Sequence, residues 1–542
     1  MAKLTGGEAV VKSLLRHDIT TIFGLPGVQN DYFYNALYDE GGKIRIIHSR
    51  HEQGAAYMAL GYAMSTDKVG LYNVVPGAGF LNTTCALSTA YGANAKVFCL
   101  TGEILSHAMG RGIGQLHEIP DQLGIMQRLT KYAAHIGSPA EAPRLINEAI
   151  RQLHSDRPRP VGVQIPMDIL MKKTEVDLTV PDLEPYHPPV DLDAVDAAAK
   201  KLGEAKRPLI FVGGGAQHAS EEVTQLAEML QAPVVAYSMG CGVVDGRHYL
   251  SQFVPGGYFL MKEADAILAI GTRLDRPGNR WGIDLSDRLI HLNVDPNEHI
   301  NSFKPNLSIV ADSKEATQAL IELVGKYNIK RESREDEMMT LKGRVSKLTD
   351  YLAPQKAYLK EIRSALPEDG IFVDEVTQIG FASRIMMPTF APRKTISPGY
   401  QGTLGWGFAT ALGVKVAHPD KPVLAVSGDG GFMFTMPELA TAVQHKIGLV
   451  TMVFNDGAFG NVRRMQKNDH GNRLIASDLQ NPDFVKLAEA FGAQGLRANS
   501  PEALKTAIEK GFATPDVPTI IDVPVGEMPS PWPLIMNPSA FE

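Results

Sequence analysis

Cysteine is scarce in this chain. Cys85, Cys99 and Cys241 are the only three in 542 residues, they lie far apart, and no two have the spacing of a CxxC motif. The sequence therefore excludes a disulfide framework and a cysteine-based zinc site. Free cysteines are typical of a reducing compartment, and the first residues lack the apolar core of a signal peptide. These features predict a cytoplasmic protein.

An excess of positive charge is lacking too. The chain has 53 Lys and Arg against 60 Asp and Glu, a formal net charge of -7, and no basic block. It therefore has no electrostatic footprint for nucleic acid. The longest uncharged stretch, residues 69–95, contains Pro76 and several glycines, which suit a buried strand, a loop and a helix better than a lipid-facing helix. We expect neither a nucleic-acid partner nor a membrane span.

Apolar segments, by contrast, recur along the whole chain. Short runs rich in β-branched residues alternate with longer amphipathic stretches, which is the pattern of βα units on parallel sheets. A proline-rich linker at 185–189 and a charged connector at 326–347 divide the chain. The pattern predicts an α/β protein with three doubly wound parallel-sheet domains, at residues 1–180, 190–325 and 353–535.

The predicted middle domain begins with an apolar strand at 208–212, followed by Gly213-Gly214-Gly215. A nucleotide phosphate could approach such a turn, but the glycines do not form a GxGxxG motif and no acidic ribose partner is evident. A tight turn between a strand and a helix is the simpler interpretation. A NAD-dependent dehydrogenase stays open as an alternative.

A candidate metal site lies in the predicted third domain. The apolar strand 423–427 leads into Gly428-Asp429-Gly430-Gly431, and the next apolar strand, 449–454, ends in Asn455-Asp456. A right-handed crossover would place both strand ends at the same edge of a parallel sheet. Hard oxygen ligands, with glycines that let the backbone approach phosphate, suit a Mg²⁺ ion that bridges protein and diphosphate.

These motifs resemble those of the thiamine diphosphate (ThDP) enzymes of the acetolactate synthase, pyruvate oxidase and benzaldehyde lyase superfamily, whose signature is GDG followed at a distance by Asn-Asn. The resemblance implies ThDP and Mg²⁺ as cofactors. It also implies that Asp429, Asp456 and the carbonyl of Ala458 bind the metal. Asp456 stands where the family usually has Asn, so Asn455 is kept as the alternative side-chain ligand.

The first block contains a second match. Arg50-His51-Glu52-Gln53 follows a predicted strand at 43–48 and resembles the RHEQ segment of the same family. A carboxyl group in a dry pocket can hold a proton and share it with a ring nitrogen. The resemblance implies that Glu52 hydrogen-bonds the aminopyrimidine ring of ThDP and favours the tautomer that generates the ylid. An acidic residue that merely favours the helix dipole is the alternative.

Further cofactor contacts follow from the resemblance. The segment 399–407 is similar to a glycine-rich family segment in which an apolar residue holds the cofactor bent, and Leu404 would be that wedge. Thr377 and Gln378 stand where the family begins its diphosphate loop. The implied cofactor-binding residues are Glu52, Pro76, Thr377, Gln378, Gly402, Leu404, Gly428, Gly430, Gly431 and Ala458.

Three polar residues match active-site positions of the family: Gln29, Asn73 and His117. Together with Glu52 they are the candidate catalytic residues. A histidine beside the cofactor could shuttle protons at neutral pH, whereas a lone histidine in a loop is more often structural. Arg463 and Arg464 could bind a substrate carboxylate or could simply face solvent.

The resemblance implies a ThDP- and Mg²⁺-dependent lyase or carboligase. Such an enzyme makes or breaks a C–C bond next to a carbonyl, through a ThDP ylid, in a 2-oxo acid, a 2-hydroxy ketone or a dione. Two alternatives stay open. One is acetolactate synthase proper, although Asn461 and Met465 depart from residues tied to its choice of a second oxo acid. The other is a non-catalytic homologue that acts as a subunit or scaffold.

The resemblance also bears on assembly and on a third cofactor. In the family, the first and third domains meet across a subunit interface, which implies a homodimer or homotetramer with active sites at that interface. The segments 271–276 and 293–296 resemble parts of the FAD-bearing members. Because many relatives keep the fold without the flavin, FAD binding stays open.

Overall fold

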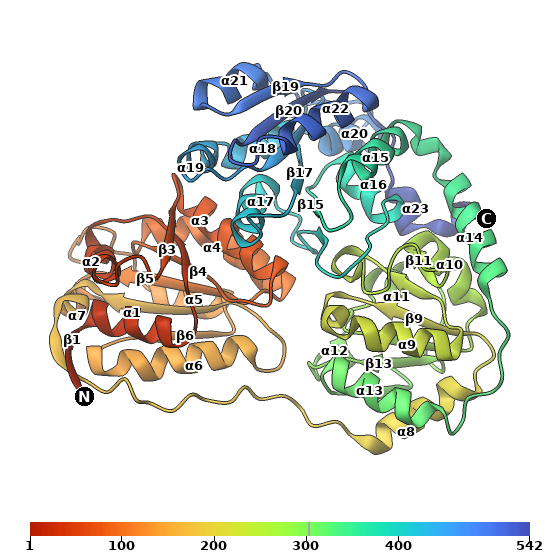
Figure 1. Cartoon of the computed structure of the whole chain (residues 1–542), viewed down its shortest axis with the longest axis horizontal. Helices are drawn as coiled ribbons and strands as arrows, with labels where there is room; N and C mark the ends of the chain where they lie inside the picture. Colours follow the sequence, from red (N-terminus) through yellow and green to blue (C-terminus); the bar gives the residue numbers. More distant parts are fainter. Residues whose placement is uncertain (302–303, 542) are drawn as a thin grey trace.

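The protein consists of three α/β domains joined by long connections. The computed structural model describes residues 1–301 and 304–541. In Figure 1 the N-terminal domain lies at the left, the middle domain at the right, and the C-terminal domain above both. Residues 177–191 contain no helix or strand before α8, and they run beneath the gap between the first two domains.

The N-terminal domain is built on a six-stranded parallel sheet in the order β3-β2-β4-β5-β7-β6. All residues of β4 and β5 are buried, because helices cover both faces of the sheet. The strands are β2 Thr21–Gly24, β3 Arg45–His48, β4 Gly70–Val74, β5 Val97–Glu103, β6 Tyr132–His135 and β7 Val161–Pro166, and β1 Ala2–Thr5 pairs antiparallel with β8 Lys173–Val176. The helices are α1 Gly6–Arg16, α2 Asp31–Asp39, α3 Glu52–Ser65, α4 Ala78–Ala93, α5 Gln122–Leu129, α6 Ala142–His154 and α7 Met167–Met171.

The middle domain has a second parallel sheet, in the order β11-β10-β9-β12-β13-β14. Its strands are β9 Pro208–Val212, β10 Val234–Ala236, β11 Ser251–Phe253, β12 Ala266–Ile270, β13 Leu289–Leu292 and β14 Leu307–Ile309. Its helices are α8 Leu192–Glu204, α9 Ser220–Leu230, α10 Val254–Glu263, α11 Asp275–Arg280, α12 Glu298–Asn301 and α13 Ser313–Val324. The connector to the C-terminal domain forms α14, Glu335–Leu348, which has few buried residues, as its charge predicts.

The C-terminal domain has a third parallel sheet, in the order β16-β15-β17-β18-β20-β19. Its strands are β15 Ile371–Val373, β16 Thr395–Ile396, β17 Val423–Gly428, β18 Val450–Asn455, β19 Gln494–Arg497 and β20 Thr519–Pro524. Its helices are α15 Ala353–Ala365, α16 Gln378–Met386, α17 Trp406–Ala417, α18 Asp429–Thr435, α19 Glu438–Gln444, α20 Gly460–Asp469, α21 Phe484–Phe491, α22 Pro501–Phe512 and α23 Trp532–Met536.

The first and third sheets share one topology. Numbered from its own first parallel strand, each has the order 2-1-3-4-6-5, whereas the middle sheet has the order 3-2-1-4-5-6. Helices lie on both faces of all three sheets (Figure 1). The fold class predicted from the sequence, three doubly wound parallel-sheet domains, is therefore confirmed.

The N- and C-terminal domains pack against each other through α3 and α17, which lie side by side in Figure 1. Two glycines allow the close approach. A Cβ on Gly61 would lie 1.9 Å from the carbonyl oxygen of Thr410, and one on Gly413 would lie 1.8 Å from that of Met58. The buried residues of the two domains form one hydrophobic cluster as a result.

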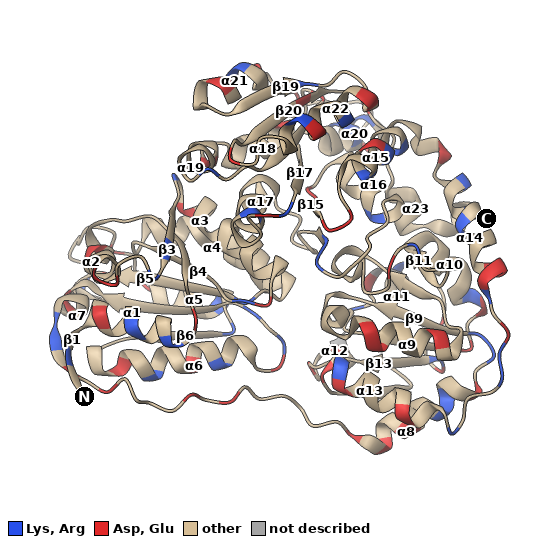
Figure 2. Cartoon of the chain, in the orientation of Figure 1, with Lys and Arg blue, Asp and Glu red and all other residues tan. Residues whose placement is uncertain are grey.

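Charged residues of both signs are interspersed along the three domains (Figure 2). Cys85, Cys99 and Cys241 are free thiols. Within residues 1–301 and 304–541, no helix has both the length and the apolar character needed to cross a membrane.

Candidate active site

Asp429 lies at the carboxyl end of β17, where it is the first residue of α18 and is almost fully buried. Its Oδ1 accepts from the backbone N–H of Gly430 at 2.9 Å, and its Oδ2 accepts from the N–H of Gly457 at 2.9 Å. Asn481 Nδ2 donates to Oδ2 at 2.6 Å. Burial raises the pKa of Asp429 although these hydrogen bonds lower it. The backbone N–H of Gly457, just beyond the end of the neighbouring strand β18, thus helps to fix the Asp429 carboxylate.

Asp456 lies beside Asp429, one residue beyond the end of β18. Burial, and then the charge of Asp429, raise the pKa of Asp456 to about 6. A Cβ on Gly460 would lie 2.3 Å from Asp456 Oδ2, so the absence of a side chain at Gly460 leaves room for this carboxyl group. Two partly desolvated carboxyl groups that repel each other form the hard-oxygen donor set that suits a divalent cation.

Asn455, the alternative ligand, has both ends of its side-chain amide bound by other side chains. Its Nδ2 donates to Asp522 Oδ1 at 3.2 Å, and its Oδ1 accepts from Asn481 at 3.0 Å. Asp456, in contrast, lines a small cavity together with Ala458 and Gln378. This geometry favours Asp456 over Asn455 as the side chain available to a metal.

Thr377 and Gln378 reach the same region from the start of α16. The Thr377 hydroxyl caps this helix by accepting from the N–H of Gly380 at 2.8 Å, and its methyl group would lie 3.3 Å from a Cβ on Gly428. With its amide oriented so that the oxygen accepts, Gln378 binds Arg464 Nη1 at 2.8 Å. The structure therefore brings Gln378 and Arg464 to the Asp456 cavity, as part of one wall.

The glycine-rich segment before α17 forms a loop between the two domains. Gly402 and Gly405 have φ values of 55° and 79°, which favour glycine, and Leu404 between them is half-buried. Thr403 accepts from Tyr57 of the N-terminal domain at 3.0 Å. This contact anchors the loop that carries the predicted wedge.

Glu375 was not among the predicted site residues. It is fully buried at the end of β15, and its Oε1 accepts from the N–H of Gly405 at 2.8 Å while Ser427 donates to its Oε2. A Cβ on Gly431 would lie 2.7 Å from Glu375 Oε1. Burial raises the pKa of Glu375 to about 7. This side chain ties the glycine-rich loop to the strand end that bears Asp429, and its only sequence signal was an acid directly after an apolar strand.

In the N-terminal domain, Glu52 is the first residue of α3 and is half-buried. Asn82 Nδ2 donates to Glu52 Oε2 at 3.0 Å, and a Cβ on Gly79 would lie 3.5 Å from Glu52 Oε1. The carboxylate therefore lies beside the first turns of α4, which begins two residues after Pro76.

A second carboxylate that the sequence did not reveal holds this turn in place. Glu438, buried at the start of α19, accepts from the backbone N–H groups of Arg50, at 3.0 Å, and His51, at 2.9 Å. A Cβ on Gly54 would lie 2.2 Å from Glu438 Oε1. The C-terminal domain thus positions the turn that presents Glu52.

Gln29 and His117 are brought together. His117 Nδ1 lies 3.0 Å from Gln29 Oε1, and Gln29 Nε2 donates to the carbonyl of Leu116 at 2.9 Å. The carbonyl oxygen of His117 would lie 2.0 Å from a Cβ on Gly77, which directly follows Pro76. These three candidate residues, Gln29, Pro76 and His117, therefore form one cluster at the carboxyl edge of the first sheet.

Asn73 lies in a different environment. It is buried within β4, where its Oδ1 accepts from Asn30 at 2.9 Å and its Nδ2 donates to the carbonyl of Leu100 at 3.0 Å. Both ends of the amide are therefore occupied by the protein. In this structure Asn73 accepts a hydrogen bond from Asn30 and does not line the cluster of Gln29 and His117.

Comparison with known proteins identifies the family. Three family models of the thiamine pyrophosphate enzymes match in order: the N-terminal TPP binding domain over residues 4–125, the central domain over 195–320 and the C-terminal TPP binding domain over 375–523. The chain belongs to this family. Thiamine pyrophosphate is ThDP, so the cofactor that the motifs implied is confirmed at the level of the family's binding domains.

Similar proteins cover nearly the whole chain. A probable 2-ketoarginine decarboxylase of Pseudomonas aeruginosa is 32% identical, over 96% of this chain and 94% of that protein. An acetolactate synthase of Arthrospira platensis is 31% identical, over 98% and 96%. The acetolactate synthase large subunit of Haemophilus influenzae is 30% identical, over 100% and 98%. This ThDP-family chain is therefore an enzyme of the acetolactate synthase-like group, as its motifs predicted.

Proposed function

We propose that this enzyme uses ThDP and Mg²⁺ to make or break a C–C bond next to a carbonyl, with a 2-oxo acid, a 2-hydroxy ketone or a dione as substrate. The observation that carries the proposal is the pair of electrostatically interacting carboxyl groups, Asp429 and Asp456, at adjacent strand ends of a ThDP-family domain. Relatives named as a decarboxylase and as acetolactate synthases support the reaction class.

The residues present fit the metal and the diphosphate. Asp429, Asp456 and the carbonyl of Ala458 would hold Mg²⁺, because a divalent cation relieves the repulsion between the two carboxylates. The glycines from Gly428 to Gly431 would let backbone approach the diphosphate. The cavity wall with Gln378 and Arg464 adds a polar and a cationic side chain, and Thr377 precedes it at the start of α16.

ThDP, when bound, supplies the nucleophilic carbon and the electron sink. The protein's own part is to orient and to move protons. Glu52 would hold a proton opposite the pyrimidine ring, and the hydrogen-bonded pair of Gln29 and His117 would give or take a proton at the substrate's oxygen.

Apolar side chains are exposed around both groups of site residues. Val28, Leu81, Ile113 and Leu116 surround the first group, and Met433, Phe434, Val462 and Met465 surround the second. Exposed apolar clusters of this kind mark protein interfaces. We propose that a second copy of the chain covers them, so that a homodimer or homotetramer completes each active site.

Acetolactate synthase proper is the second candidate, favoured by the names of the relatives at 30–31% identity. It would form acetolactate from pyruvate, and a colour assay for acetoin after acidification distinguishes it. Against it, α20 carries the half-buried Asn461 and the exposed Met465, which depart from that enzyme's pattern.

The proposal is tested by screening oxo acids, acyloins and diones with ThDP and Mg²⁺ while carbon dioxide and aldehyde are measured separately. Replacing Glu52 with Gln should remove nearly all turnover while ThDP still binds, because only the proton-holding group is lost. The matched control is Glu509→Gln, an exposed residue of α22, which should leave turnover unchanged. If no compound reacts although ThDP binds, the non-catalytic alternative replaces this proposal.

A further inference from the structure

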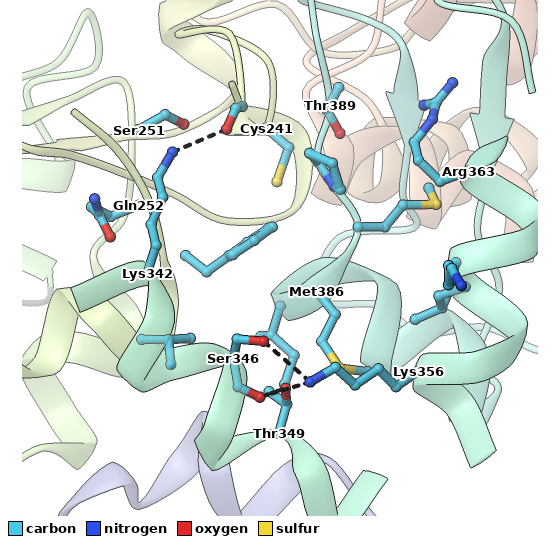
Figure 3. A pocket seen from close by; sticks show the side chains of 18 of the residues that line it. Cys241, Ser251, Gln252, Lys342, Ser346, Thr349, Lys356, Arg363, Met386 and Thr389 are labelled. Carbon is cyan, nitrogen blue, oxygen red and sulfur yellow. Dashed lines mark hydrogen bonds between the residues drawn. The ribbon is translucent and has the colours of Figure 1, made fainter. Parts of the chain in front are cut away.

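A large cavity lies between the middle domain and the connection to the C-terminal domain. Its volume is about 650 Å³, and its walls come from β10 and β11, from α14 and α15, and from the end of α16 with the residues after it (Figure 3). It includes none of the residues assigned above to the cofactor, and it lies apart from segments 271–276 and 293–296. Its size falls in the range of small-molecule sites, roughly 300–1,000 Å³.

Most of the lining is apolar. Met386 projects toward the centre of the cavity in Figure 3. The other apolar lining residues include Ala236, Phe253, Val345, Leu359, Ile385 and Met387. Such a surface excludes water and would leave a small hydrated ion without contacts, so it favours a ligand with an apolar body.

The charged groups that line the cavity are nearly all positive. They are Lys342, Lys356, Lys360 and Arg363, and Asp350 is the only acid among the described lining residues. Lys356 Nζ donates to Asp350 Oδ1 at 2.8 Å and to Ser346 at 2.9 and 3.1 Å, as Figure 3 shows for Ser346. This one pair neutralises a single lysine.

Two of the remaining cations, Lys342 and Arg363, bind backbone carbonyls. Lys342 donates to the carbonyl of His248 at 2.7 Å and to that of Gly246 at 3.2 Å, and Arg363 donates to the carbonyl of Pro367 at 3.0 Å. Asp245 interacts electrostatically with Lys342, and Glu368 interacts with Arg363, but both acids pair with Arg247. Glu502, which does not line the cavity, interacts electrostatically with Lys360. The cavity therefore retains an excess of positive charge beside an apolar surface.

We propose that this cavity is a binding site for an amphipathic organic anion. A carboxylate or sulfonate head would bind Lys360 at the rim, while Lys342 and Arg363 add positive charge from the two sides of the cavity, and an aromatic or branched apolar body would pack on Leu359 and Met386. The apolar walls lower the local dielectric, which strengthens the attraction between the head and these cations. The proposal does not rest on the proposed reaction, because no residue of the cofactor site takes part.

The site can be tested with 8-anilinonaphthalene-1-sulfonate, a fluorescent amphipathic sulfonate, titrated into the full chain loaded with ThDP and Mg²⁺. We expect one saturable site per chain. Replacing Lys360, an exposed residue of the rim, with Glu should weaken binding about tenfold or more, because an attraction becomes a repulsion. Ala357→Trp, which fills the cavity from α15, should weaken it similarly.

The matched control is Lys347→Glu, an exposed lysine of α14 outside the lining, which should bind the probe like wild type. Unlabelled 4-phenylbutyrate should displace the probe, whereas its neutral amide should not. Binding that does not saturate, equal affinity in the Lys360 and Lys347 variants, or equal displacement by the amide would each overturn the proposal. Circular dichroism and ThDP binding establish that every variant is folded, so a loss of probe binding is distinguished from unfolding.

Discussion

At the scale of single residues, the proposed metal site depends on the electrostatic interaction between Asp429 and Asp456. Two backbone N–H groups and the Asn481 amide donate hydrogen bonds to Asp429. Burial and the charge of Asp429 raise the pKa of Asp456. A pair of this kind is unfavourable without a cation, which is why we assign it to a metal.

Asp456 offers a direct test of that assignment. Asp456→Asn keeps a side-chain oxygen and should retain Mg²⁺ and ThDP binding, whereas Asp456→Ala should weaken Mg²⁺ binding by about 100-fold, since even supporting residues of metal sites cost about 10–100-fold. Calorimetric titration of Mg²⁺ in the presence of ThDP measures both. Wild-type affinity in Asp456→Ala would instead make Asn455 the ligand.

Glu375 should impose a pH dependence on stability. Its pKa is about 7 in the folded protein against 4.5 ordinarily, so the folded state binds its proton more tightly than the unfolded state does. The free energy of unfolding should therefore fall as the pH rises from about 4.5 to about 7, by at most about 3 kcal/mol. In Glu375→Gln the thermal midpoint, measured without ThDP, should change less between pH 5 and pH 8.

Glu509→Gln serves as the control for that measurement, because Glu509 is exposed on α22. An unchanged pH dependence in Glu375→Gln would show that the carboxyl group does not hold its proton in the folded state.

Single residues also show why sequence reasoning reached only part of the site. Glu52 and Asp429 lie in short motifs, so their neighbours in sequence suffice to single them out. Glu438 acts on Arg50 and His51, which are 388 and 387 residues away, and no local pattern records such a contact. Asn481 was missed for the same reason, because its partners Asp429 and Asn455 lie on other elements.

At the scale of elements, the crossing of α3 and α17 decides how two domains fit together. The backbones approach so closely that no side chain fits at Gly61 or Gly413. Nearly all residues of both helices are buried, and nothing in the local sequence shows that the two helices face each other across a domain boundary.

Gly413→Val should destabilise the protein by about 1–3 kcal/mol or more, because its Cβ would overlap the carbonyl of Met58 and force the helices apart. The matched control is Gly343→Ala in α14, where a Cβ meets nothing within 4 Å. That change should stabilise its helix by about 1 kcal/mol. Thermal unfolding of both variants measures the difference, and an equal effect would contradict the tight crossing.

At the scale of the whole molecule, the first and third domains repeat one strand order, and each presents one group of site residues beside exposed apolar side chains. Three domains could be predicted from the alternation of strands and helices. The packing of the C-terminal segment against the middle domain could not be predicted. Leu534 and Ile535 are buried in the hydrophobic cluster of the middle domain, although they follow the third sheet in sequence. Nothing in the local sequence specifies that destination.

If a second copy completes each site, two inactive variants should rescue each other. We expect Glu52→Gln and Asp429→Asn each to be inactive alone. After dissociation and random reassociation, half the dimers are mixed and have one intact site of two, so activity should return to about a quarter of wild type. Turnover of the mixture measures this. The control mixes Glu52→Gln with itself, and a mixture that stays inactive would place both residues in a site made by one chain.

Helix α16 links two parts of the molecule that were described separately. It begins at Gln378 beside the Asp456 cavity and ends at Met386 in the wall of the cationic cavity, and its nine residues span about 12 Å between their ends. The buried pair of Arg384 and Asp374 ties it to β15. If a ligand in one cavity favours one position of this helix, it changes the affinity of the other cavity for its own ligand. The effect is reciprocal: if the organic anion alters the affinity for ThDP by some factor, ThDP alters the affinity for the anion by the same factor.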